Sequence, residues 1–243
     1  MILGILFFLL GVILGWFLPG FALYLLHNKP TKLTLYCKAC QVDRRQGQLS
    51  PAFPPQCEVC GTHLSPSFVT SALLTGLIYG TLWMVIGWTG EFIIALILVP
   101  VLLIAWMTDQ WCRLILDRVT IPSAILFLLL RLWIREEVWV NYLFAFLFGG
   151  GVLLFLGWIS RGGMGGGDAK LLAMGGAALG FPDVLTAFGL AVFSGGLWSL
   201  ILLVTRRADY KEAIPFGFHL AIGIFVAFLW SETLVKWYLS TFL

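Results

Sequence analysis

Two acidic side chains stand out in a chain that is otherwise strongly apolar. Asp109 lies in the stretch AWMTDQWCRLILDRVTIP, and Asp168 follows a run of glycines in SRGGMGGGDAKLLAMGG. Carboxylates near a lipid bilayer are costly and usually face a polar cavity or a partner. Two carboxylates brought close together cannot both ionise easily, so one keeps a proton while the other acts as a base. Such a pair can activate water to attack a peptide carbonyl and then protonate the leaving amine, titrating as one unit.

The residues alone leave other interpretations of these acids open. Asp168 is also suited to cap the start of the following helix, and Asp109 to reach water from the edge of the bilayer. A pair of acids can also hold a divalent cation or relay protons in a transporter. The glycine run is not a P-loop, because no Gly-Lys-Ser/Thr follows it, and no soluble strand precedes it as in a dinucleotide-binding fingerprint. Beside a reactive acid, glycines let a substrate backbone approach without meeting a Cβ.

Four of the five cysteines form two CxxC pairs. The pairs are Cys37-Lys-Ala-Cys40 and Cys57-Glu-Val-Cys60, separated by 16 residues. This spacing is typical of a structural zinc site with four thiolate ligands. Two disulfides or free thiols are the alternative. The distribution of basic residues described below predicts that this segment is cytoplasmic, which argues against disulfides. The segment is too small and too polar to bury a core of its own, so a metal would supply folding free energy.

The composition predicts a membrane protein with several spans. The 243 residues are 60% hydrophobic and only 11% charged, and the mean hydropathy is +0.97. These values exclude an ordinary soluble domain, so we expect a lipid bilayer and no nucleic acid among the partners. The first apolar run lacks a basic n-region and a small-residue cleavage site, which favours a retained span. We expect an all-α protein with eight spans, at about 2–26, 68–89, 92–108, 119–134, 138–159, 169–181, 184–204 and 213–232.

The predicted spans and the cysteine pairs divide the chain into a first transmembrane helix at 1–26, a zinc-binding insert at 27–67 and a transmembrane bundle at 68–243. With eight spans, four basic segments fall on one side of the membrane, which is therefore predicted to be cytoplasmic, and both termini face outward. These segments contain Lys29, Lys32, Lys38, Arg44, Arg45, Arg113, Arg118, Arg161, Lys170, Arg206, Arg207 and Lys211. The opposite side holds few basic residues, namely Arg131, Arg135 and Lys236.

These motifs, in this order, resemble the type IV prepilin peptidase family, bacterial intramembrane aspartic proteases of the GxGD type. The CxxC pairs resemble the family's cytoplasmic zinc domain, and EAIPFGFHLAIG resembles the start of its last span. DQWCRLILDRVTIP resembles the family's D-x-D-H-x-x-L-P-D stretch, which places Asp109 on the first catalytic aspartate and Asp117 on a later acidic position. GMGGGDAKLLAMGGAALG resembles its G-M-G-x-G-D-x-K-L-L-A segment. That match places Asp168 on the second catalytic aspartate, and Gly165 and Gly167 on the motif glycines.

Lys170 and the departures from the family pattern bear on how the site would work. Lys170 is a candidate to hold an anionic group or to bias the charge of the acid pair, and the alternative is a lysine that reaches for lipid phosphate. Trp111 and Cys112 stand where the family has an aspartate and a histidine. The N-terminal GWFLPGFALYLLH lacks the Asn and Arg of the family's G-S-F-L-N-V-x-x-x-R stretch. That stretch is linked to N-methylation with S-adenosylmethionine, so methylation by this chain stays open.

The resemblance implies an endopeptidase of the bacterial inner membrane with structural zinc. Its substrates would be prepilins or pseudopilins, cut on the cytoplasmic side after the glycine of the leader. The alternatives are a non-catalytic pilus-assembly scaffold and a proton-coupled transporter. Retention of both aspartates argues against a scaffold. Their position at the predicted ends of spans, rather than near the midplane, argues against a transporter.

Overall fold

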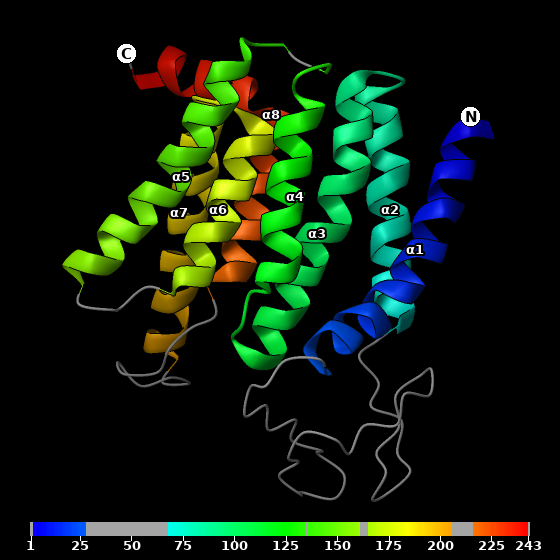
Figure 1. The fold of residues 1–243 in the computed structure, drawn as a ribbon, viewed down its shortest axis with the longest axis horizontal. Helices are drawn as coiled ribbons and strands as arrows, with labels where there is room; N and C mark the ends of the chain where they lie inside the picture. The colour runs from blue at the N-terminus through cyan, green and yellow to red at the C-terminus, as the bar shows by residue number, and fades with distance from the viewer. Residues whose placement is uncertain (1, 28–67, 135, 161–164, 206–215, 243) are drawn as a thin grey trace, which may run out of the picture. The chain divides into compact units, whose positions relative to one another are not determined.

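The computed structural model describes residues 2–27, 68–134, 136–160, 165–205 and 216–242, and the regular elements among them are all α-helices. The all-α class predicted from the apolar runs is therefore confirmed for this part of the chain. The segment with Cys37, Cys40, Cys57 and Cys60 lies outside the described residues. The eight helices are α1 (Ile2–His27), α2 (Phe68–Ile86), α3 (Gly90–Cys112), α4 (Asp117–Leu130), α5 (Trp139–Ile159), α6 (Gly166–Leu179), α7 (Asp183–Val204) and α8 (Gly217–Phe242) (Figure 1).

Six of these helices, α1, α2, α3, α5, α7 and α8, are long and apolar enough to cross a membrane. The chain is therefore a multi-pass membrane protein. Helices α4 and α6 have 14 residues each, which makes them roughly 21 Å long, less than the roughly 30 Å of a hydrocarbon core. The eight predicted helices are confirmed near their expected positions, and the crossing of the membrane by α4 and α6 stays a prediction.

The chain divides into two compact units, Met1–Cys112 and Arg113–Leu243. In the first unit, α1 and α2 pack along small residues. A Cβ on Gly15 would lie 2.6 Å from the carbonyl oxygen of Ser71, so only glycine allows the two backbones to come this close. Gly11 precedes Gly15 by four residues and meets α2 in the same way, which is the small-xxx-small pattern of membrane helix pairs.

In the second unit, α6 is the central helix. It contacts α4, α5, α7 and α8, and Figure 1 shows it between α4 and α5. Ala169 and every residue from Leu171 to Leu179 are buried. A Cβ on Gly176 would lie 2.2 Å from the carbonyl oxygen of Ala145 in α5. Small side chains thus allow α6 to be enclosed on all sides by its neighbours.

Arg131 fixes the C-terminal end of α6. Its side chain is only 2% exposed, and its Nε donates a hydrogen bond of 3.0 Å to the carbonyl oxygen of Ala178, which also accepts from Nη2. The guanidinium lies 4.5 Å from the centre of the Tyr142 ring. The charge pattern of the sequence places Arg131 on the side of the membrane opposite the basic segments. The structure buries its side chain against the carbonyl of Ala178 near the end of α6, where a cation is favourable.

Candidate active site

Asp109 lies inside the last turn of α3. The helix runs to Cys112, four residues beyond the predicted span, so Asp109 is held by regular helical backbone instead of a loop. Its side chain is buried, with 5% exposure, as is that of Thr108 beside it. Asp109 thus lies at the end of an apolar helix, as the sequence predicted.

Asp168 lies in the first turn of α6. Gly165 is the N-cap and α6 begins at Gly166, so the alternative in which Asp168 itself caps the helix is wrong. An acidic side chain in a first turn interacts favourably with the positive end of the helix dipole. The backbone N–H of Asp168 donates to the carbonyl of Gly165 at 3.1 Å. A Cβ on Gly165 would lie 3.2 Å from Oδ2 of Asp168, so this glycine leaves room for the carboxylate.

The two glycines between the cap and the aspartate have different surroundings. A Cβ on Gly167 would lie 3.0 Å from the Cβ of Ile115, in the segment that precedes α4, whereas a Cβ on Gly166 would meet nothing within 4 Å. Close packing against Ile115 therefore explains why position 167 has no side chain. It leaves Gly166 as the open position at the start of the helix.

We expect Gly167→Ala to lower the free energy of unfolding by about 1–3 kcal/mol, because the added methyl presses on a β-branched residue close to the backbone. Gly166→Ala is the matched control and should leave the stability unchanged or raise it by up to about 1 kcal/mol. Thermal or denaturant unfolding of the purified protein in detergent measures both. Equal effects of the two substitutions would contradict the packing role of Gly167.

Lys170 and Asp117 form an ion pair. Nζ of Lys170 lies 3.0 Å from Oδ2 of Asp117, and each side chain is 46% exposed. The pair joins the first residue of α4 to the fifth residue of α6, two positions after Asp168. The sequence left three roles open for Lys170: to hold an anionic group, to bias the charge of the acid pair, or to reach for lipid phosphate. The structure pairs it with a protein carboxylate. A half-exposed pair of this kind contributes at most about 1 kcal/mol to stability.

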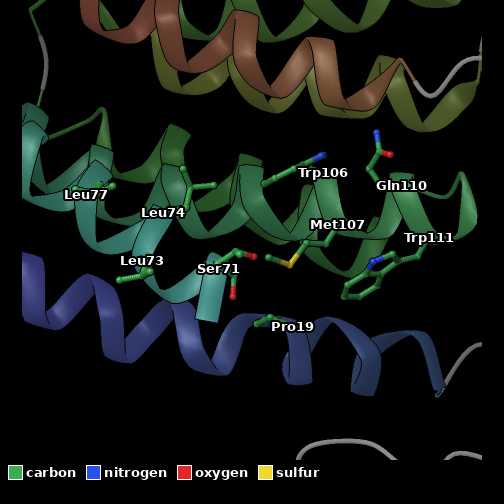
Figure 2. Close-up of a pocket in the computed structure, with 10 residues that line it drawn as sticks. Pro19, Ser71, Leu73, Leu74, Leu77, Trp106, Met107, Gln110 and Trp111 are labelled. Atoms are coloured by element: carbon green, nitrogen blue, oxygen red, sulfur yellow. The ribbon is translucent and has the colours of Figure 1, made fainter. Parts of the chain in front are cut away.

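A mostly apolar groove borders the turn of α3 that carries Asp109 (Figure 2). Its volume is about 470 Å³, and it is formed within the first unit by side chains of α1, α2 and α3. Gln110 and Trp111, which follow Asp109 directly, contribute to it. The resemblance noted in the sequence leads one to expect an aspartate at position 111, and the tryptophan there adds apolar surface to the groove. The lining consists of Pro19, Thr70, Ser71, Leu73, Leu74, Leu77, Trp106, Met107, Gln110 and Trp111.

The predicted site residues thus fall into two groups. Asp109 belongs to the first unit, and Asp117, Gly165, Gly167, Asp168 and Lys170 belong to the second. The predicted pairing of the two aspartates stays a prediction. Within the second unit, the sequence did not indicate the contact of Gly167 with Ile115 or the Lys170–Asp117 pair. Both join residues about 50 positions apart, and no local pattern reports such contacts.

A family model described as the type IV leader peptidase family matches residues 96–200. The matched region includes Asp109, Asp117, Gly165, Asp168 and Lys170. No solved structure matches the chain at a significant level.

Several curated proteins named prepilin leader peptidase/N-methyltransferase are similar to the chain. The Bacillus subtilis protein is 27% identical over 185 residues, which cover 76% of this chain and 75% of the relative. The Aeromonas salmonicida protein is 31% identical over 199 residues, covering 77% and 66%. The Aeromonas hydrophila protein is 30% identical over 197 residues, covering 77% and 67%.

Proposed function

The chain belongs to the type IV leader peptidase family, and we propose that it is a membrane-embedded aspartic endopeptidase that removes the leader peptide of type IV prepilins or pseudopilins. The observation that carries this proposal is the match of residues 96–200, which includes both candidate aspartates in their motif contexts. The similar proteins named as prepilin leader peptidases support the same substrate class.

We assign the reaction to Asp109 and Asp168 acting as a pair. One carboxylate takes a proton from water while the water oxygen attacks the carbonyl carbon of the scissile peptide. The other, protonated at the start, gives its proton to the leaving nitrogen as the C–N bond breaks. The products are a leader with a new carboxyl group and a mature pilin with a new amino terminus. The burial of Asp109 and the helix-end position of Asp168 support such a role for each carboxylate.

The proposed location is the bacterial inner membrane, with the site facing the cytoplasm. Eight spans place the basic segments on the cytoplasmic side, together with the end of α3 and the start of α6. In this arrangement α4 and α6 cross as short helices, with α6 shielded from lipid by its neighbours. The basic leader of the substrate would remain in the cytosol, and its apolar helix would lie against the transmembrane bundle at 68–243.

The segment 27–67 is proposed to bind one structural zinc ion through Cys37, Cys40, Cys57 and Cys60. Four thiolates at this spacing suit a closed tetrahedral site, which would fold the segment without taking part in hydrolysis. We expect the purified protein to contain one zinc ion per chain by elemental analysis, and Cys40→Ser to lose most of it. Cys112→Ser is the matched control, since Cys112 lies outside the two pairs. Equal zinc contents in the two variants would contradict the assignment.

Cleavage is tested by co-expressing the chain with a prepilin and following loss of the leader by gel shift. Mass spectrometry of the product then gives the cut position and shows whether the new amino terminus carries a methyl group from S-adenosylmethionine. Cleavage after the leader glycine supports the proposal, with or without methylation. An unprocessed prepilin in the presence of folded protein would favour the scaffold alternative.

A further inference from the structure

Two helices of the first unit contain a proline in their interior. Pro19 lies in α1 and Pro100 lies in α3. A proline has no N–H, so the carbonyl four residues before it loses its usual helical donor. The affected carbonyls are those of Gly15 in α1 and Leu96 in α3. In an apolar surrounding, a carbonyl without a donor is costly.

Helix α2 supplies a hydroxyl to each of these two carbonyls. Ser71 Oγ donates to the carbonyl oxygen of Gly15 at 2.7 Å, and Tyr79 Oη donates to the carbonyl oxygen of Leu96 at 2.6 Å. Both donors are buried, and Tyr79 has no exposed surface. The same contact occurs once with α1 and once with α3, which indicates that the hydroxyls compensate for the prolines.

The contact on α3 bears on the candidate aspartate. Asp109 lies nine residues after Pro100, or roughly 14 Å along the helix axis. A change of about 5° in the bend at the proline would therefore move the carboxylate by roughly 1 Å. Errors of this size in the placement of a reacting group can lower a rate by about 100-fold.

We propose that Tyr79 is a positioning residue for Asp109: its hydrogen bond to the carbonyl freed by Pro100 fixes the bend of α3 and so the place of the carboxylate. This inference rests on the proposed function, in which Asp109 is catalytic. It assigns no contact with substrate to Tyr79. The role is distinct from that of an ordinary core tyrosine, because it depends on the presence of Pro100.

The test is a double-mutant cycle of Tyr79→Phe and Pro100→Ala, with cleavage of a purified prepilin measured in detergent. We expect Tyr79→Phe to lower kcat about 10- to 100-fold with a change in KM of less than about 3-fold. Pro100→Ala restores an N–H for the Leu96 carbonyl, so the added loss from Tyr79→Phe in that background should be less than about 3-fold. Multiplicative losses in the double variant would overturn the proposal.

Thr75→Val is the matched control. Thr75 is fully buried one turn before Tyr79, and its hydroxyl donates to the carbonyl of Ser71 in its own helix. This variant should keep its kcat within about 3-fold of the wild type, and a loss as large as that of Tyr79→Phe would overturn the positioning role.

Asp109→Asn in the same assay separates the positioning role of Tyr79 from the catalytic role of Asp109. If Asp109→Asn is inactive and Tyr79→Phe is fully active, only the role of Tyr79 fails. If Asp109→Asn is active, the catalytic assignment itself fails.

Discussion

Replacing either Asp109 or Asp168 with asparagine is expected to slow leader removal by about 100- to 10,000-fold, because an amide can neither accept the proton of water nor return one to the leaving amine. Asparagine keeps the size of the side chain, so the helices should remain folded. The measurement is the initial rate of prepilin cleavage by variants purified to equal amounts, each with a melting temperature close to that of the wild type.

The pair hypothesis adds a sharper expectation. If the two aspartates act as one unit, the double variant should be about as slow as either single variant, because each substitution already removes the shared step. Glu91→Gln is a suitable control, since Glu91 is an acid in the first turn of α3, at the end opposite Asp109. Maturation of prepilin at the normal rate by Asp109→Asn or Asp168→Asn would refute the assignment of that residue.

Gly176→Leu is expected to cause a large loss of stability. A Cβ at this position would lie 2.2 Å from the carbonyl oxygen and 2.6 Å from the carbonyl carbon of Ala145. These are backbone atoms of α5 and cannot rotate away, so the two helices must separate. We expect a loss of about 3 kcal/mol or more, at or above the upper end for overpacked positions, measured as a lower melting temperature in detergent.

Gly151→Leu on α5 is the matched control for this substitution. A Cβ on Gly151 would meet nothing within 4 Å, and the residue is exposed. Leucine at this position should therefore leave the melting temperature close to that of the wild type. If Gly176→Leu were as stable as Gly151→Leu, the close packing of α5 and α6 would be wrong.

The sequence predicted the helices well, because long apolar runs separated by polar residues have few other interpretations in a membrane protein. The boundaries were less accurate. Helix α3 continues four residues past its predicted end, and α8 extends from Gly217 to Phe242, ten residues past its predicted end at 232. Apolar patterns weaken near the membrane surface, whereas helical hydrogen bonding can continue into polar sequence.

The candidate aspartates were also identified from the sequence, because their motifs are local. The contacts that hold their helices were not. Tyr79 with Leu96 and Arg131 with Ala178 are hydrogen bonds from a side chain to a backbone carbonyl on another helix. Pro100 does signal that a carbonyl needs a new donor, but only the packed structure identifies which side chain supplies it. A lone arginine at the end of an apolar run gives a similar, incomplete signal.

Because α6 is enclosed by its neighbours, its position should respond little to changes in bilayer thickness. A span that faces lipid tilts or shifts when the bilayer becomes thicker or thinner, in order to reduce hydrophobic mismatch. In the proposed arrangement, α6 contacts α4, α5, α7 and α8 instead of lipid, so these helices would set its depth. The height of Asp168 should therefore stay constant when acyl-chain length varies, and the surrounding helices should absorb the mismatch.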